Sequence, residues 1–162
     1  MIKTAKKQEE YVKVKRTQNS AIDTLAGILG EYVFAEYFFG DWKNNFVGDN
    51  KGKEDFENIE IKTSAYPFNE HLNLLVREDY AEKRNPPFYI QIIIDVHSKN
   101  AEDIFPNTDT YICGYATNEE DDNAPKRDFG SKFGGPGGYD CHYIPIKDLH
   151  PMENFEENYN KL

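Results

Sequence analysis

The first strong pattern in the chain is helical and covers residues 20–39. Ser20 is a good N-cap with Asp23 three positions later, and Gly40 is a typical helix end. Across Phe34–Phe39 nearly every side chain is apolar, which predicts a buried central helix. Apolar residues recur at helical spacing before that point: they are Ile22, Leu25, Leu29, Tyr32 and Val33.

Strands are predicted further along by alternating or continuous apolar runs. The run at 88–96 combines β-branched and aromatic residues, which is typical of an inner strand covered on both faces. Shorter strands are predicted at 46–47, 71–76, 110–116 and 142–146. The last of these contains Pro145, which favours a sheet edge.

Helical or loop segments connect and flank these strands. Residues 1–19 are polar and basic and predict a helix or an ordered arm. A short helix is predicted over Arg77–Arg84, because Asn85-Pro86-Pro87 would stop it. The glycines at 134–138 predict a loop. A terminal helix is predicted from Asp148 or His150 to about Tyr159.

This order of elements predicts an α/β protein with a mixed central β-sheet flanked by helices. A chain of 162 residues suits one domain with a sizeable core. We expect a helix or arm at 1–19, a core at 20–116, and a loop, an edge strand and a C-terminal helix at 117–162.

Residues 55–64 predict a tight hairpin that turns at Glu57-Asn58. Opposed residues, and residues two apart on one strand, point to the same face of a sheet. One face would hold three charged residues and the other three apolar residues: Asp55, Glu60 and Lys62, and Phe56, Ile59 and Ile61. The apolar face belongs to the core and sets the register.

The charged face has a chemical use. Two carboxylates with a third oxygen ligand suit a hard divalent cation, Mg²⁺ or Mn²⁺. A neighbouring Lys could orient or deprotonate a water, or stabilise charge that develops on a phosphorane. The same residues also suit a cross-strand ion pair on a half-exposed hairpin, which is common and weakly stabilising. The residues alone leave both interpretations open.

Three segments together resemble a known family. Asp55 followed by Glu60-Ile61-Lys62-Thr63-Ser64 resembles the metal-binding core of the PD-(D/E)XK, or restriction-endonuclease-like, nuclease superfamily. Residues 27–35, with Glu31, are similar to the first core helix of that family and its inward Glu. Residues 111–116 resemble a later strand of its phage and restriction-type members. The resemblance covers roughly residues 20–116.

The resemblance implies a restriction-endonuclease-like core and a Mg²⁺- or Mn²⁺-dependent hydrolysis of DNA. Asp55 and Glu60 would hold the metal with the main-chain carbonyl of Ile61. Lys62 would orient or activate the attacking water, and Glu31 would bind a second metal or a metal-bound water. The family usually shows a longer gap between its Asp and its Glu-x-Lys than the one in this chain.

Other polar residues near these segments have two interpretations each. Asp49 competes with Asp55 for the ligand role but also suits a turn. Glu36 suits a structural ion pair or an exposed position. Gln91 could position a water or a phosphate, or form a hydrogen bond in the core. Gly27 and Gly30 lower helix propensity but allow another element to approach closely.

The formal net charge of −10 counts against nucleic-acid binding, because Lys and Arg supply most non-specific affinity for phosphates. Basic residues nevertheless gather locally. They are Lys3, Lys6, Lys7, Lys13, Lys15 and Arg16, then Lys51 and Lys53, Lys83 and Arg84, and Lys126 and Arg127. DNA is the substrate that the resemblance implies. An inactive nuclease-fold binding or accessory protein and an RNA-directed nuclease are the alternatives.

Location and assembly are constrained only weakly. No apolar run is long enough to span a bilayer, and no signal-peptide pattern opens the chain. Cys113 and Cys141 fit reduced thiols and match no zinc spacing. We expect a cytoplasmic protein with no membrane partner. A homodimer is compatible with the sequence, as are both end cleavage and internal cleavage.

Overall fold

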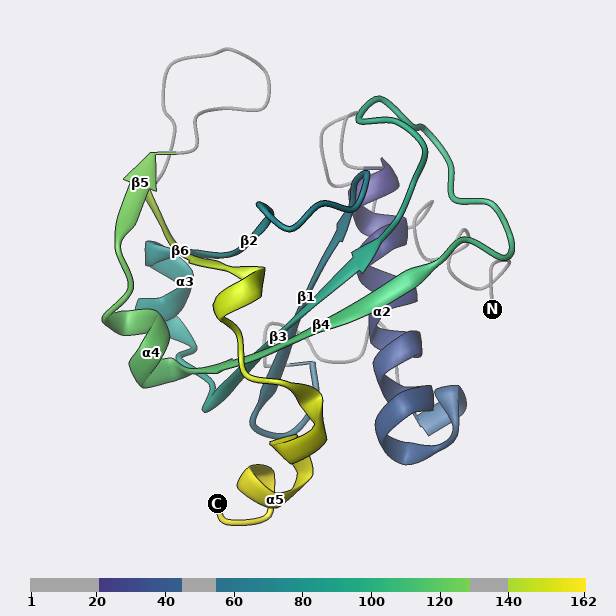
Figure 1. Ribbon diagram of the computed structural model, residues 1–162. Coiled ribbons are helices and arrows are strands. Elements are labelled where there is room, and N and C mark those ends of the chain that lie inside the picture. The colour runs from purple at the N-terminus through teal and green to yellow at the C-terminus, as the bar shows by residue number, and fades with distance from the viewer. Residues whose placement is uncertain (1–20, 45–54, 129–139) are drawn as a thin grey trace.

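The computed structural model describes residues 21–44, 55–128 and 140–162 (Figure 1). The arm at 1–19, Ser20, the strand at 46–47, Asp49 and the loop at 134–138 lie outside these residues. The described helices are α2 (Ala21–Phe39), α3 (Glu78–Lys83), α4 (Asn118–Asp122) and α5 (Phe155–Tyr159), with 3₁₀ turns η2 (Trp42–Asn44), η3 (Ile146–Asp148) and η4 (Met152–Asn154). The strands are β1 (Ile59–Ala65), β2 (Asn73–Arg77), β3 (Phe88–Ile94), β4 (Thr110–Thr117), β5 (Lys126–Asp128) and β6 (Asp140–Pro145).

The described strands form two sheets. In the first sheet, β3 pairs parallel with β1 and antiparallel with β4, so β3 is central. Every residue of β3 is buried, which confirms the predicted inner strand. In the second sheet, β6 pairs antiparallel with both β2 and β5. The α/β class is confirmed and the first sheet is mixed, but the strand expected at 71–76 belongs to the second, antiparallel sheet.

The predicted edge position of the strand at 142–146 is also wrong. This strand is β6, the middle strand of the second sheet. Pro145 is its last residue and lies opposite Asn73. A proline at a strand end removes little from the hydrogen-bond ladder, because no further residues depend on its missing N–H. The proline therefore marks the end of this strand and not the edge of the sheet.

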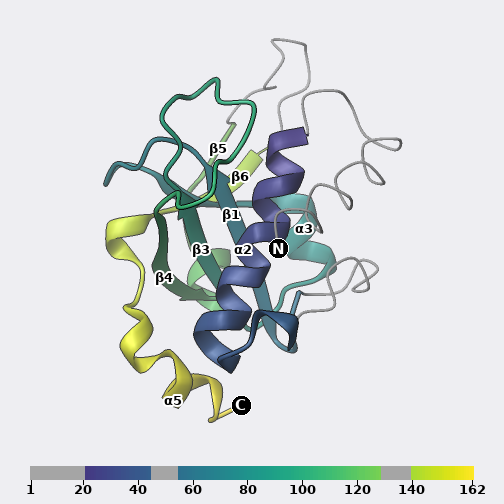
Figure 2. The same cartoon turned by 90° about the vertical axis from the view of Figure 1, so that its right-hand side faces the viewer.

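Helices cover one face of the first sheet, and the second sheet with α3 covers the other (Figure 2). The core on the helical side is formed by residues of α2, α5, β1 and β3: Phe34, Phe155, Ile59, Ile61, Ile90 and Ile92. The core on the opposite side joins β2 and α3 to the sheet through Leu74, Val76, Ala81, Tyr89 and Ala116. Alternate residues of β1 therefore face either the helices or the second sheet.

Helix α2 ends at Gly40, as predicted. Gly40 has φ +76°, and its N–H donates to the carbonyl of Glu36 at 3.0 Å. The buried residues of α2 lie between Leu25 and Ala35. The last turn is not buried all round, because Glu36, Tyr37 and Phe39 are exposed. The apolar composition there overstates the burial, since the sheet lies along one side of the helix.

The shorter helices agree with the sequence in most respects. The helix expected over 77–84 is α3. The expected terminal helix is confirmed in part, because it is divided into η4 and α5. Among the described residues, no helix has the length and apolar character that a bilayer crossing requires.

Candidate active site

A short hairpin at the start of β1 positions the first acidic residue. Phe56 and Ile59 exchange two backbone hydrogen bonds of 3.0 Å, as predicted. Asn58 in the turn has φ +66°, a left-handed conformation that Asn tolerates better than most residues. The Phe56–Ile59 bridge is isolated, so this backbone pairing does not continue along β1. At the next outward-facing position, Oδ2 of Asp55 accepts a hydrogen bond from the N–H of Ile61 at 2.8 Å. Asp55 is thereby tied to the outer edge of β1.

Ile61 contributes its main chain at the same edge. Strand β1 is an outer strand, with β3 on its other side. The N–H and C=O of one strand residue point to the same edge. Because the N–H of Ile61 meets Asp55, its carbonyl also faces that edge. A main-chain carbonyl and a carboxylate therefore share the outer edge of β1, while the side chain of Ile61 is buried in the core.

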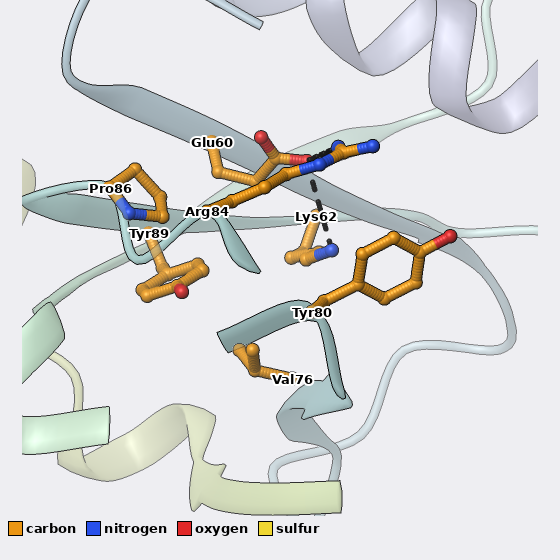
Figure 3. Close-up of a pocket in the computed structure, with 7 residues that line it drawn as sticks. All are labelled: Glu60, Lys62, Val76, Tyr80, Arg84, Pro86 and Tyr89. Atoms are coloured by element: carbon orange, nitrogen blue, oxygen red, sulfur yellow. Dashed lines mark ion pairs between the residues drawn. The ribbon is translucent and has the colours of Figure 1, made fainter. Parts of the chain in front are cut away.

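Glu60 and Lys62 point to the face of β1 that the second sheet and α3 cover (Figure 3). Nζ of Lys62 lies 3.8 Å from Oε1 of Glu60, and Nη1 of Arg84 lies 3.8 Å from the same oxygen. Glu60 is only 8% exposed. Its second oxygen, Oε2, is buried and accepts no hydrogen bond from the described residues. One oxygen of Glu60 thus meets two cations, while the other is buried without a hydrogen-bond partner among the described residues.

Glu31 reaches this edge from α2. Its side chain shares a hydrogen bond with the side chain of Asp55. Burial, the charge of Asp55, the hydrogen bond with Asp55 and the charge of Glu60 together raise the pKa of Glu31 to about 9. Glu31 is therefore protonated at neutral pH and donates to Asp55. Burial also raises the pKa of Asp55, although the hydrogen bond from Ile61 and the charge of Lys62 oppose the rise.

Gly30 allows α2 to bring Glu31 so close to β1. A Cβ atom at Gly30 would overlap Oγ1 of Thr63 and lie 2.8 Å from its Cβ. The predicted close approach is confirmed at Gly30. At Gly27 it is not, because a Cβ there would meet no described atom within 4 Å. The position of Glu31 therefore depends on a glycine beside it.

Glu60 completes a group of three interacting carboxyls. Burial raises the pKa of Glu60 to about 7, the charge of Asp55 adds to the rise, and Lys62 and Arg84 oppose it. Buried carboxylates that repel one another retain protons or attract cations. Each of the three carboxyl groups has a raised pKa, and burial is the largest cause in each case.

The chemistry of this donor set fits a hard divalent cation. It combines the carboxylates of Glu31, Asp55 and Glu60 with the carbonyl of Ile61, and Mg²⁺ prefers oxygen ligands of these kinds. The buried Oε2 of Glu60 is an oxygen that such a cation would use. Within the described ranges, no three Asp, Glu, His or Cys side chains are already arranged to hold a metal ion. A proton on Glu31 and the basic neighbours of Glu60 balance the charge instead.

Two other predicted candidates serve the fold. Gln91 lies beside Lys62 in the register of β1 and β3, but it is 1% exposed and its amide nitrogen donates to the carbonyl of Ile92 at 3.0 Å. This favours the hydrogen-bonded core interpretation. Glu36 is exposed, as one interpretation predicted, and its Oε2 accepts a hydrogen bond from the N–H of Trp42 at 2.9 Å.

Sequence inspection noted Arg84 as a basic residue but missed that it groups with Arg77 and Tyr80 along α3. Arg77, Tyr80 and Arg84 are spaced i, i+3 and i+7, which places them on one side of a helix and was a usable signal. The cavity beside them has a volume of about 10 Å³, enough for one water molecule. It is lined by Glu60, Lys62, Val76, Tyr80, Arg84, Pro86 and Tyr89 (Figure 3).

Comparison with known proteins identifies no relative. No protein-family model matches the chain, and no curated protein or solved structure matches it either. The chemistry of the candidate site therefore has to be inferred from its own residues.

Proposed function

We propose that this protein is a metal-dependent nuclease that hydrolyses DNA phosphodiester bonds. The observation that carries the proposal is the meeting of Glu31, Asp55 and Glu60, with Lys62 beside them, although Glu31 comes from a separate helix. An ordinary surface ion pair needs one carboxylate for each cation and no burial. One buried and two half-buried carboxyl groups with raised pKa values are costly, and such clusters are typical of functional sites.

Asp55, Glu60 and the carbonyl of Ile61 would hold Mg²⁺ or Mn²⁺, and Glu31 would add a further carboxylate toward a second cation. A bound cation would polarise the phosphoryl group and lower the pKa of a water molecule. The hydrogen bond from Ile61 fixes the orientation of Asp55. The closeness of α2 and β1 at Gly30 fixes the approach of Glu31. Glu31 belongs to a helix and Glu60 to a strand, and such elements hold a site more rigidly than loops.

Lys62 would act on the attacking water and on the phosphate. An ammonium group has three hydrogen-bond donors and no acceptor. It would orient a water by donating to the water oxygen, and it would stabilise negative charge on the phosphoryl oxygens. Glu60 at 3.8 Å and the Tyr80 ring, whose centroid lies 5.4 Å from Nζ, limit the positions of this ammonium. The contribution of Lys62 would be mainly electrostatic.

A cleavage assay tests the proposal directly. A mixture of circular and linear DNA is incubated with Mg²⁺ or Mn²⁺ and either the native chain or the Glu60→Ala/Lys62→Ala double variant. Cleavage by the native chain alone would support the proposal, and the pattern on the two DNA forms would separate internal from end cleavage. Equal cleavage by both proteins would contradict the assigned site. RNA in a parallel reaction distinguishes the two substrate classes.

A binding or accessory protein that lacks chemistry is the second candidate. Two observations favour it: the net charge of −10, and the lack of a preformed metal-holding group among the described residues. Such a protein would bind nucleic acid or another partner without cleaving it. The melting temperature in Mg²⁺ separates the two candidates. A nuclease with an intact metal site should melt at a higher temperature when Mg²⁺ is added, and Glu60→Ala should remove this increase.

A further inference from the structure

Three cationic side chains surround the ring of Tyr80. The ring centroid lies 5.0 Å from Cζ of Arg84, 5.2 Å from Cζ of Arg77 and 5.4 Å from Nζ of Lys62. Each distance is within the range of a cation–π interaction. The gathering of like charges on one ring is unfavourable unless anions balance them. The anions near each cation therefore decide what this group can bind.

Arg77 already has a full partner. Its guanidinium makes two hydrogen bonds to the carboxylate of Asp79, at 3.0 and 2.8 Å. Lys62 and Arg84, in contrast, share one oxygen of Glu60, and both lie 3.8 Å from it. Both cations also lie within electrostatic range of the carboxyl group of Asp55. At 3.8 Å neither cation forms a hydrogen bond with Glu60, so the edge of the candidate active site holds two cations without a close contact to that carboxylate.

Arg84 is the least satisfied of the three cations. A guanidinium carries five N–H donors and binds carboxylates best in a two-pronged contact of about 2.8 Å. Arg84 makes no such contact: its side chain forms no hydrogen bond with the described residues, and its ion pair with Glu60 is too long for one. The side chain is 30% exposed. Its donors are therefore available to an oxyanion that enters from solvent.

The backbone of Arg84 is held firmly. Its N–H caps α3 by donating to the carbonyl of Tyr80 at 2.9 Å. The next residue, Asn85, has φ +31°, and Pro86 and Pro87 follow it. Prolines restrict the backbone conformation after the helix, and this helps to hold the Cα and Cβ atoms of Arg84 in place. Pro86 also lines the same small cavity as Arg84 (Figure 3).

We propose that Arg84, seated on the Tyr80 ring beside Lys62, binds a phosphate of the substrate strand next to the phosphate that is cleaved. The inference rests on the proposed nuclease function for the identity of the strand, and on the unsatisfied guanidinium for the chemistry. Arg is well suited to phosphate because its planar fork matches the phosphate oxygens. The phosphate is either an internal diester or a terminal monoester, since both present the same oxygens.

Binding without cleavage tests this subsite. A fluorescein-labelled 12-mer DNA strand is titrated with protein in EDTA and, in parallel, in Ca²⁺. Arg84→Ala should raise Kd about tenfold and lower the salt dependence of binding by about one phosphate contact. Lys83→Ala is the matched control, because the exposed neighbour removes the same charge, and it should change Kd less than twofold. Arg84→Lys should fall between the native chain and Arg84→Ala, because it keeps the charge without the fork.

The same experiment distinguishes the two sources of phosphate. Strands with and without a 5′-phosphate are compared with the native chain and Arg84→Ala. A larger loss on the phosphorylated strand assigns a terminal monoester, and an equal loss assigns an internal diester. Equal weakening by Arg84→Ala and Lys83→Ala would overturn the proposal. Absence of measurable binding by the native chain in both buffers would also overturn it.

Failure of the subsite can be told apart from failure of the nuclease function. If the native chain cleaves DNA and Arg84→Ala cleaves it with unchanged KM and kcat, the subsite is wrong and the nuclease function stands. If no protein cleaves but Arg84→Ala alone weakens binding, the phosphate subsite stands and the nuclease function fails. Melting temperatures of the three variants establish that each is folded, and Arg84→Lys serves if Arg84→Ala is not.

Discussion

The carboxyl groups of Glu31 and Asp55 share a hydrogen bond, although one belongs to α2 and the other precedes β1. Two carboxyl groups can form such a bond only when one of them keeps its proton. Burial and the charge of Asp55 raise the pKa of Glu31 to about 9, so Glu31 is the protonated partner. The bond joins the helix to the strand edge, and it links the stability of the fold to pH and to cations.

Stability should fall with rising pH because of Glu31. Its pKa is raised from 4.5 to about 9 on folding, so the folded state binds more protons in this interval. The stability that the protonated carboxyl of Glu31 contributes is fully present below about pH 4.5. It is lost as the pH rises toward 9, where Glu31 ionises in the folded state. Glu31→Gln keeps a donor for Asp55 but cannot ionise. We expect its free energy of unfolding, measured with urea at a series of pH values, to fall less than that of the native chain.

The exposed Glu36 on the same helix provides a control for this experiment. Glu36→Gln makes the same substitution on the same helix outside the group of carboxyls, and it therefore controls for the general effect of the change. A Glu31→Gln curve that is parallel to the native one would show that Glu31 does not retain its proton in the folded state.

Mg²⁺ should raise the melting temperature of the native chain, and the increase should be larger at pH 8.5 than at pH 6. The cation competes with protons for Glu60, whose pKa is about 7, and for Glu31, whose pKa is about 9. At 100 times Kd the stabilisation would be about 2.7 kcal/mol. Glu60→Ala should abolish the increase. An equal increase in that variant would place the cation elsewhere.

Lys62→Ala should abolish cleavage and leave the fold intact. Loss of a group that acts on the water and the phosphate typically lowers the rate about 10²- to 10⁴-fold. Its ion pair with Glu60 is 3.8 Å long and its side chain is 27% exposed, so stability should change by less than about 1 kcal/mol. Lys126→Ala, which removes an exposed pair with Glu78, is the matched control and should cleave normally. Metal-dependent cleavage by Lys62→Ala at the native rate would refute the role.

Gly30→Ala should destabilise the protein by about 1–3 kcal/mol and displace Glu31 from β1, because the new methyl group would overlap Thr63. Gly27→Ala lies on the same helix and meets no described atom within 4 Å, so it should be neutral or stabilising by up to about 1 kcal/mol. Urea unfolding of the two variants measures the difference. Equal free energies of unfolding would contradict the close approach of α2 and β1 at Gly30.

Asp121→Asn should stabilise the protein at pH 8. Asp121 is fully buried in α4, and neither of its carboxylate oxygens has a hydrogen-bond partner in the described part of the chain. Burial raises its pKa from 3.8 to about 6, so its contribution to stability is lost as the pH rises through this interval. The advantage of the variant should disappear below about pH 4. Glu119→Gln, which removes an exposed charge from the same helix, is the matched control, and equal stability curves for the two variants would contradict the prediction.

Elements with a strong periodic pattern were predictable, because the pattern depends on which face of each element is buried. The helix ending at Gly40, the inner strand at 88–96 and the turn at Glu57-Asn58 are examples. The pattern failed where burial depends on a neighbouring element. The apolar turn at Phe34–Phe39 is partly exposed, and Pro145 ends a central strand.

From the sequence alone, Asp55, Glu60 and Lys62 could be proposed as one group. They are close along the chain, and the alternation of side chains along a strand predicts that they share one face of the sheet. Only the tertiary structure decided that Glu31 contacts Asp55, since that contact requires the helix to approach β1 at Gly30. It also brought Arg84 and Tyr80 to Lys62. Local periodicity determines which side of an element is buried, but the packing of the whole core determines which elements meet.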